Sequence, residues 1–204
     1  MSIRGLYAIT PEGVAGDDLM RMVARALEGG IGLLQYRRKE HGSLVEARAL
    51  AALCRARGVP FIVNDDVELA LAADADGAHL GRDDGALVAA RARLKGRLLG
   101  VSCYDSLPAA RAALAAGADY VAFGSVFASP TKPAAVRAPL ALFGAARSLG
   151  APLVAIGGIT LTNAPALLSA GADALAVISD LFDADDIAER ARAYGMLFEH
   201  GLSK

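Results

Sequence analysis

The chain has 204 residues, 54% of them hydrophobic, with 21 lysines and arginines against 22 aspartates and glutamates. This length suffices for one well-buried core and is short for two, so we expect a single domain over residues 1–204. The near-neutral charge excludes a global attraction to nucleic acid or to an anionic membrane, so any bound anion must be held locally.

Short apolar segments that are typical of buried strands recur along the chain. In chain order they cover Gly5 to Ile9, Leu33 to Arg37, Phe61 to Asn64, Ala78 to Leu80, Leu98 to Ser102, Tyr120 to Gly124, Leu153 to Ile156 and Ala174 to Ile178. Apolar residues return every three or four positions between them, as in Leu19, Val23 and Leu27. These intervening segments are predicted to be amphipathic helices. Strict alternation of apolar strands with helices predicts a parallel sheet covered by helices.

The second predicted helix has start and stop signals. Ser43 followed by Glu46 has the spacing of a capping box, and Gly58 followed by Pro60 supplies a stop.

Internal repeats decide between an open sheet and a closed barrel. The segment 116–125 (AGADYVAFGS) resembles 170–179 (AGADALAVIS), and 75–81 (ADGAHLG) is a weaker third copy. A repeated helix-Gly-Ala-Asp-strand unit favours a (β/α)8 TIM barrel built from equivalent modules. The glycine of each copy is expected to end its helix in a left-handed turn.

In such a barrel, the loops after the carboxyl ends of the strands form the active face. Gln35, Arg37 and Lys39 alternate along the second strand and its exit, so their side chains are expected to project into the barrel mouth. An inward arginine is costly unless an anion pairs with it, which favours a binding role for Arg37. Lys39 by itself suits a solvated rim better than a binding role. Tyr36 and Arg38 have the opposite parity and are weaker candidates.

Two aspartates follow neighbouring strands. Asp65 comes directly after the third strand, and Asp84 follows the fourth. Carboxylates brought together repel each other unless a cation separates them, and an oxygen-only pair suits Mg²⁺. Asp84 has an equally good reading as the cap of the helix that starts near Gly85, whereas Asp66 and Asp83 read as caps or solvated neighbours.

Two later loops suit phosphate groups. Ser129, Thr131 and Lys132 place hydroxyls beside an ammonium group after the sixth strand. Gly157-Gly158 after the seventh strand and Ser179 after the eighth occupy the place where these barrels commonly bind phosphate on backbone amides. A solubilising lysine and ordinary turn glycines are the alternatives. Two such loops beside a carboxylate pair favour a site for two phosphorylated groups.

The remaining reactive residues predict little chemistry of their own. Cys54 and Cys103 are the only cysteines, without CxxC or zinc-ligand spacing, so a reducing cytoplasm is expected. Cys103 reads as an apolar filler, and His79 reads as a satisfied polar residue inside the barrel. No stretch approaches the roughly 20 apolar residues of a membrane span.

Together these residues resemble the thiamine-phosphate synthase family over essentially the whole chain. The motifs that carry the resemblance are segments 6–10 (LYAIT), 35–39 (QYRRK), 64–65 (ND), 79–84 (HLGRDD), 100–102 (GVS), 124–133 (GSVFASPTKP), 155–159 (AIGGI) and 177–179 (VIS). Each motif is weak alone, whereas their joint order and spacing are specific.

The resemblance implies an Mg²⁺-dependent transferase that joins a pyrimidine diphosphate to a thiazole phosphate and releases pyrophosphate. Asp65 and Asp84 would carry the metal, and Arg37, Lys39, Ser102 and Lys132 would act on the leaving pyrophosphate. The implied substrate-binding set is Gln35, Tyr36, Arg37, Arg38, Lys39, Asn64, Ser102, Ser129, Thr131, Lys132, Gly158, Ile178 and Ser179.

One departure from the family pattern concerns Cys103-Tyr104, where the family often has a Thr-His pair. The absence of that histidine from this chain argues against the function of a related thiazole tautomerase, which uses a histidine near this position. A tautomerase-like enzyme and a catalytically silent precursor-binding paralogue are the alternative functions on the same barrel.

Overall fold

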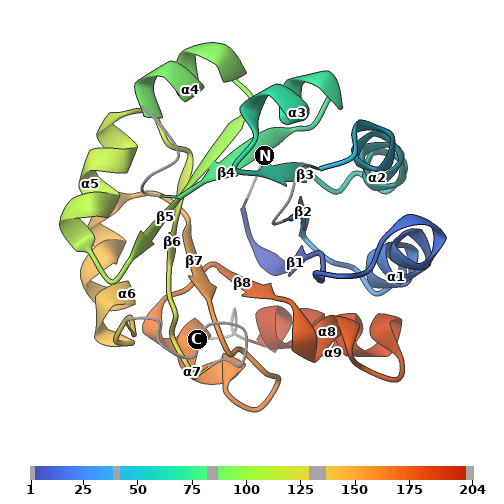
Figure 1. The fold of residues 1–204 in the computed structure, drawn as a ribbon. Coiled ribbons are helices and arrows are strands. Elements are labelled where there is room, and N and C mark those ends of the chain that lie inside the picture. The colour runs from blue at the N-terminus through green and yellow to red at the C-terminus, as the bar shows by residue number, and fades with distance from the viewer. Residues whose placement is uncertain (1–2, 39–41, 82–86, 129–136, 201–204) are drawn as a thin grey trace.

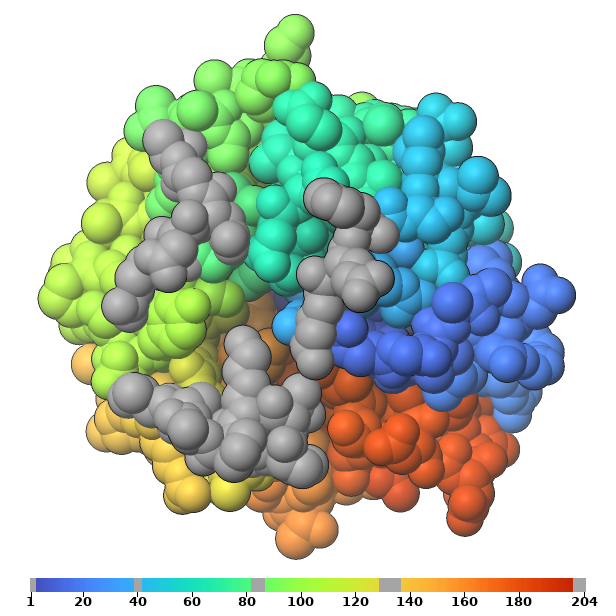
Figure 2. All heavy atoms as spheres, in the orientation of Figure 1, coloured from blue at the N-terminus to red at the C-terminus, as the bar shows by residue number. Residues whose placement is uncertain are grey.

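The computed structural model describes residues 3–38, 42–81, 87–128 and 137–200. Its strands form a closed parallel barrel in the order β1 to β8, with helices around the outside (Figure 1). The colours of Figure 2 run round the molecule in chain order, as repeated strand-helix units require. This confirms the predicted (β/α)8 barrel.

The strands lie close to the predicted segments. They are β1 Gly5–Ile9, β2 Leu33–Tyr36, β3 Phe61–Asn64, β4 Gly77–Leu80, β5 Leu98–Tyr104, β6 Tyr120–Phe123, β7 Leu153–Ile156 and β8 Ala174–Val177. The largest difference is at β5, which continues two residues beyond the predicted end at Ser102. Its pairing with β6 shifts register between Ser102 and Tyr104, so Cys103 is an extra, bulged residue that sequence periodicity does not reveal.

Helices follow each strand. They are α1 Gly16–Glu28, α2 Leu44–Ala56, α3 Val67–Ala72, α4 Leu87–Leu94, α5 Leu107–Ala115, α6 Ala141–Ala146 with the 3₁₀ helix η1 Arg147–Leu149, α7 Ala164–Ala170, α8 Ser179–Phe182 and α9 Ile187–His200. Within the described ranges, no helix has the length and apolar character needed to cross a membrane.

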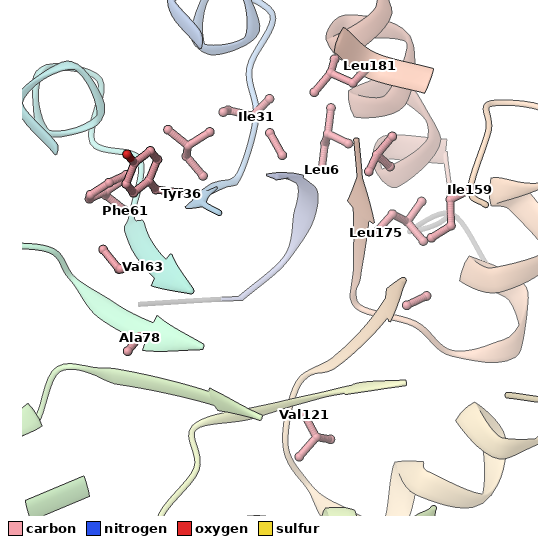
Figure 3. Packing of buried hydrophobic residues seen from close by; sticks show 14 of the residues in the cluster. Leu6, Ile31, Tyr36, Phe61, Val63, Ala78, Val121, Ile159, Leu175 and Leu181 are labelled. Atoms are coloured by element: carbon pink, nitrogen blue, oxygen red, sulfur yellow. The ribbon is translucent and has the colours of Figure 1, made fainter. Parts of the chain in front are cut away.

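Alternation of side chains along the strands creates two hydrophobic layers. The outward residues form one layer with the helices and loops around them, and Figure 3 shows two pairs of neighbours in it, Tyr36 beside Phe61 and Leu175 near Ile159. The inward residues fill the barrel itself, among them Tyr7 and Tyr120. The inner layer therefore contains polar hydroxyl groups below the mouth of the barrel.

The repeated aspartates perform one structural task. The carboxylates of Asp76, Asp119 and Asp173 accept hydrogen bonds from backbone N–H groups at the start of the preceding strand, at distances of 2.8, 2.7 and 2.9 Å. The repeated aspartate thus joins neighbouring strands at the amino-terminal end of the barrel, the end where residues serve stability.

The expected glycine turns are present in two copies only. Gly117 and Gly171 have φ angles of 95° and 111°. In the third copy Gly77 lies within β4, and Asp74 takes the left-handed conformation with a φ of 54°. The prediction was wrong there because aspartate also tolerates this region.

Asp76→Ala is expected to lower the free energy of unfolding by about 1–3 kcal/mol, because the N–H of Phe61 loses its side-chain acceptor. Urea denaturation measures this. Asp76→Asn keeps an acceptor oxygen and is the control, with a smaller expected loss. Equal stability of wild type and Asp76→Ala would contradict the assigned role.

Only half of the predicted capping box forms at α2. The Ser43 hydroxyl accepts from the backbone N–H of Glu46, as predicted. The reciprocal bond, from the backbone N–H of Ser43 to the Glu46 carboxylate, does not form between these two described residues. That carboxylate accepts instead from the Tyr36 hydroxyl, the Arg38 guanidinium and the backbone N–H of Gly16.

Candidate active site

A cavity of about 780 Å³ opens at the carboxyl ends of the strands. Every strand contributes a lining residue: Ile9, Gln35, Asn64, His79, Ser102, Ala122, Ile156 and Val177. This is the end of the barrel where the sequence predicted the site.

The exit of β2 places Gln35 and Arg37 in the cavity lining, as their parity predicted. Gln35 is 3% exposed, and its amide nitrogen donates to the Tyr7 hydroxyl at 2.9 Å. The N–H of Arg37 donates to the Thr10 hydroxyl at 2.9 Å, while its guanidinium donates to Glu12 at 2.8 Å. The anion expected beside Arg37 is therefore supplied, in this structure, by Glu12.

Tyr36 and Arg38 point to the other side of β2, and the structure does not bring them to the cavity. The Tyr36 hydroxyl donates to Glu46 at 2.6 Å, and Arg38 donates to the same carboxylate at 2.7 Å. The Arg38 guanidinium lies 5.1 Å from the centre of the Tyr36 ring. Burial by itself raises the pKa of Glu46, but the bonds from Tyr36, Gly16 and Arg38 outweigh it and lower that pKa. Both predicted side chains thus anchor helix α2 to the barrel wall.

The end of β3 presents Asn64 and Asp65 to the cavity. Asp65 has a φ of 61°, and its carboxylate accepts from the Asn64 amide. The backbone N–H of Asp65 donates to the His79 carbonyl at 2.8 Å, which fixes this turn against β4. Asp66 caps α3 through the N–H of Leu69, as predicted.

Asp65 is the described member of the predicted metal pair. Among the described ranges, no group of three or more His, Cys, Asp or Glu side chains is placed to hold a metal ion. Mg²⁺ needs only one or two carboxylates, because waters and substrate phosphate complete its shell. The Asp65 carboxylate, an oxygen ligand in the cavity lining, is consistent with that requirement.

Below the mouth, Ser102 lies against His79, with 2.9 Å between the hydroxyl and Nε2. His79 Nδ1 is 3.2 Å from the Tyr120 hydroxyl, so the prediction of a satisfied histidine inside the barrel is confirmed. Cys103 is buried, as expected of a filler, and its thiol donates to the Val101 carbonyl. Tyr104 lines the cavity with a φ of 54°.

The opposite side of the cavity is formed by the loops after β7 and β8. Gly157 and Gly158 have φ angles of 105° and 63°. A Cβ atom on Gly158 would overlap the Ala128 carbonyl, so this position needs glycine for space as well as conformation. The Asn163 amide donates to the Gly158 carbonyl at 2.9 Å and holds the turn. Gly158, Ile178 and Ser179 all line the cavity.

Several lining residues escaped the sequence-based search. Tyr7 lines the cavity although it does not lie at a strand end, and Arg190 reaches the cavity from helix α9. Glu12, which accepts from the lining residue Arg37, was not predicted either. Arg190 pairs with Asp180 at 2.9 Å, and the Tyr194 hydroxyl donates to the same carboxylate at 2.7 Å. A search confined to strand ends does not find a residue from the last helix. Tyr7 could have been found from the sequence, because its hydroxyl is the one polar side-chain group in the otherwise apolar first strand.

The other predicted residues lie outside the described ranges. They are Lys39, Asp84, Ser129, Thr131 and Lys132, together with Arg82 and Asp83.

Comparison with known proteins gives one consistent result. The family model described as thiamine monophosphate synthase matches residues 6–181. A thiamine-phosphate synthase from Aromatoleum aromaticum is 60% identical over 97% of each chain, and one from an Azoarcus species is 58% identical over 96% of this chain and 98% of the relative. The solved structure of thiamine phosphate pyrophosphorylase from Pyrococcus furiosus aligns with a TM-score of 0.87 and 34% identity, covering 98% of this chain and 97% of that one.

Proposed function

Since the chain belongs to the thiamine monophosphate synthase family, we propose that its barrel mouth holds an aminopyrimidine diphosphate beside a thiazole phosphate. Its activity is that of a thiamine-phosphate synthase, a transferase of thiamine biosynthesis. The proposed substrates are 4-amino-2-methyl-5-(diphosphooxymethyl)pyrimidine and 4-methyl-5-(2-phosphooxyethyl)thiazole, and residues 1–204 act as one catalytic domain.

The observation that carries this proposal is the division of the cavity into two unlike halves. Gln35, Arg37, Asn64, Asp65 and Ser102 place amides, a cation and hydroxyl or carboxylate oxygens along β2 to β5. The β7 and β8 side instead presents Gly158, Ile178 and Ser179, where backbone groups are accessible. The polar half suits a diphosphate with a heteroaromatic ring, and the glycine half suits a single phosphate.

Mg²⁺ is proposed to bind at Asp65 and, from the sequence, at Asp84. When bound, it would neutralise part of the negative charge on the leaving pyrophosphate. The same negative charge is proposed to be stabilised by hydrogen-bond donors and cations of the protein, namely Arg37, Lys39, Ser102 and Lys132. The hydrogen bond that the Arg37 guanidinium donates to Glu12 positions this guanidinium at the cavity wall before substrate arrives.

The proposed reaction is a dissociative substitution. The bond between the pyrimidine methylene carbon and the pyrophosphate oxygen breaks first, and its electron pair leaves with pyrophosphate. The aminopyrimidine ring stabilises the resulting cation, and the thiazole nitrogen attacks it to form the new bond. Proximity of two held substrates and stabilisation of leaving-group charge are sufficient for this step, so no covalent nucleophile on the protein is needed.

Pyrophosphate release tests the proposal. Release is expected only with both substrates and Mg²⁺ present, and it should cease when any one is omitted. Release without the thiazole phosphate would indicate hydrolysis, and its absence under all conditions would favour a precursor-binding protein.

Gly158→Ala is expected to raise the KM for thiazole phosphate at least about tenfold, a loss of ~1.4 kcal/mol, because the added methyl group displaces the turn that holds the phosphate. Steady-state kinetics with each substrate varied measure this. Gly150→Ala is the matched control: its φ of 68° imposes similar backbone strain, but its Cβ meets nothing within 4 Å. An unchanged KM in Gly158→Ala would remove this turn from the phosphate site.

A further inference from the structure

Five side chains form a continuous hydrogen-bonded row across the barrel, at the floor of the cavity. Gln35 Nε2 lies 2.9 Å from the Tyr7 hydroxyl, which lies 2.8 Å from the Tyr120 hydroxyl. Tyr120 is 3.2 Å from His79 Nδ1, and His79 Nε2 is 2.9 Å from the Ser102 hydroxyl. The row thus connects Gln35 with Ser102, and both belong to the half of the cavity proposed to bind the pyrimidine diphosphate.

Glycine at position 100 makes the row possible. In the register of the sheet, Gly100 on β5 lies between His79 on β4 and Tyr120 on β6. A Cβ atom on Gly100 would overlap the Tyr120 ring and come within 2.5 Å of His79 Nδ1. The absent side chain lets two residues from strands that are not neighbours meet.

Counting protons gives the row a direction. The amide nitrogen of Gln35 can only donate, so the Tyr7 oxygen is the acceptor of that bond. Either tyrosine can donate in the next bond, and donation from Tyr7 is the arrangement that gives the Tyr7 proton an acceptor among the described residues. In this arrangement Tyr120 donates to His79 Nδ1, and the ring proton of His79 lies on Nε2. Burial raises the pKa of both tyrosines, so they remain protonated donors.

The last bond sets the role of the serine. With the proton of His79 on Nε2, the ring donates to the Ser102 oxygen, and the Ser102 proton can point into the cavity. If His79 carried its proton on Nδ1, the serine would have to donate to the histidine instead. A lone pair would then face the phosphate oxygens, where a donor is needed.

We propose that Tyr120 is a positioning residue for the reaction: it fixes the tautomer of His79 and so makes Ser102 a hydrogen-bond donor to the leaving pyrophosphate. This inference rests on the proposed site for the pyrimidine diphosphate. Tyr120 does not touch substrate, because it is fully buried and absent from the cavity lining.

A double-mutant cycle between Tyr120 and Ser102 tests the inference. Tyr120→Phe keeps the ring and is expected to lower kcat about tenfold, with the KM for thiazole phosphate unchanged. In the Ser102→Ala background the same change is expected to have less than about a twofold effect, because Tyr120 acts through the serine. Equal factors in both backgrounds, or wild-type kcat in Tyr120→Phe, would overturn the inference.

Val121→Ala is the control for stability. It deletes buried methyl groups from the next residue of β6, on the outer side of the barrel, and leaves the hydrogen-bonded row intact. Its kcat per folded molecule is expected to equal that of the wild type. A kcat loss as large as that of Tyr120→Phe would mean that general weakening of β6 explains both.

A second readout does not depend on activity. Nitrogen NMR of the histidine side chains is expected to show His79 as the neutral Nε2–H tautomer in the wild type and a shift toward Nδ1–H in Tyr120→Phe. The chain has three histidines, so the spectrum of His79→Gln assigns the signal. A wild-type Nδ1–H tautomer would overturn the inference. If instead the tautomer is as expected but Ser102→Ala keeps full kcat, the proposed pyrophosphate site fails.

Discussion

Asp65→Asn is expected to lower kcat by about 10²–10³-fold while the barrel stays folded. The substitution removes the negative charge that would hold Mg²⁺ at the leaving group, a contribution of several kcal/mol to the transition state. Asparagine tolerates the left-handed backbone of this position, where φ is 61°, so the turn is preserved. Pyrophosphate release at saturating substrates, measured against Mg²⁺ concentration, gives the effect.

The neighbouring aspartate offers a matched control. Asp66 caps α3 through its side chain, and asparagine is an equally good capping residue, so Asp66→Asn is expected to keep near wild-type kcat. The assignment of Asp65 fails if Asp65→Asn retains wild-type kcat at limiting Mg²⁺. Similar losses in the two variants would point to the shape of the turn rather than to the metal.

Lys132→Ala is expected to reduce kcat by a factor on the order of 10² to 10³. Negative charge on the departing pyrophosphate grows as the carbon–oxygen bond breaks, so an ammonium group beside it contributes more in the transition state than in the ground state. Initial rates with both substrates saturating measure this change.

Ser129→Ala is the companion variant that separates the two phosphate roles. It is expected to raise the KM for thiazole phosphate, because that phosphate keeps its charge during the reaction and serves only as a handle. If Lys132→Ala raised that KM alone and kept wild-type kcat, Lys132 would belong to the acceptor site. Leaving-group stabilisation would then rest on Mg²⁺, Arg37 and Lys39.

Position near a strand end predicts some of the residues that line the cavity but not all of them. Gln35, Asn64 and Ser102 follow from their place near the ends of predicted strands, because parallel strands of a barrel deliver those residues to one face. Tyr36 and Arg38 share the same segment, but their parity directs them to Glu46 on the outer side. Family resemblance alone did not distinguish the two sides of β2.

Local sequence alone determined the barrel, because apolar periodicity and the Gly-Ala-Asp repeat are properties of short segments. The order and spacing of the motifs along the whole chain predicted the family, because each motif is weak alone. Tertiary structure alone decided the partners: Glu12 for Arg37, and Tyr120 between Tyr7 and His79. The two tyrosines are 113 positions apart in the chain, and only closure of the barrel at a particular register brings their hydroxyls to 2.8 Å. No local pattern encodes such a contact, because its distance and direction depend on every strand between the two residues.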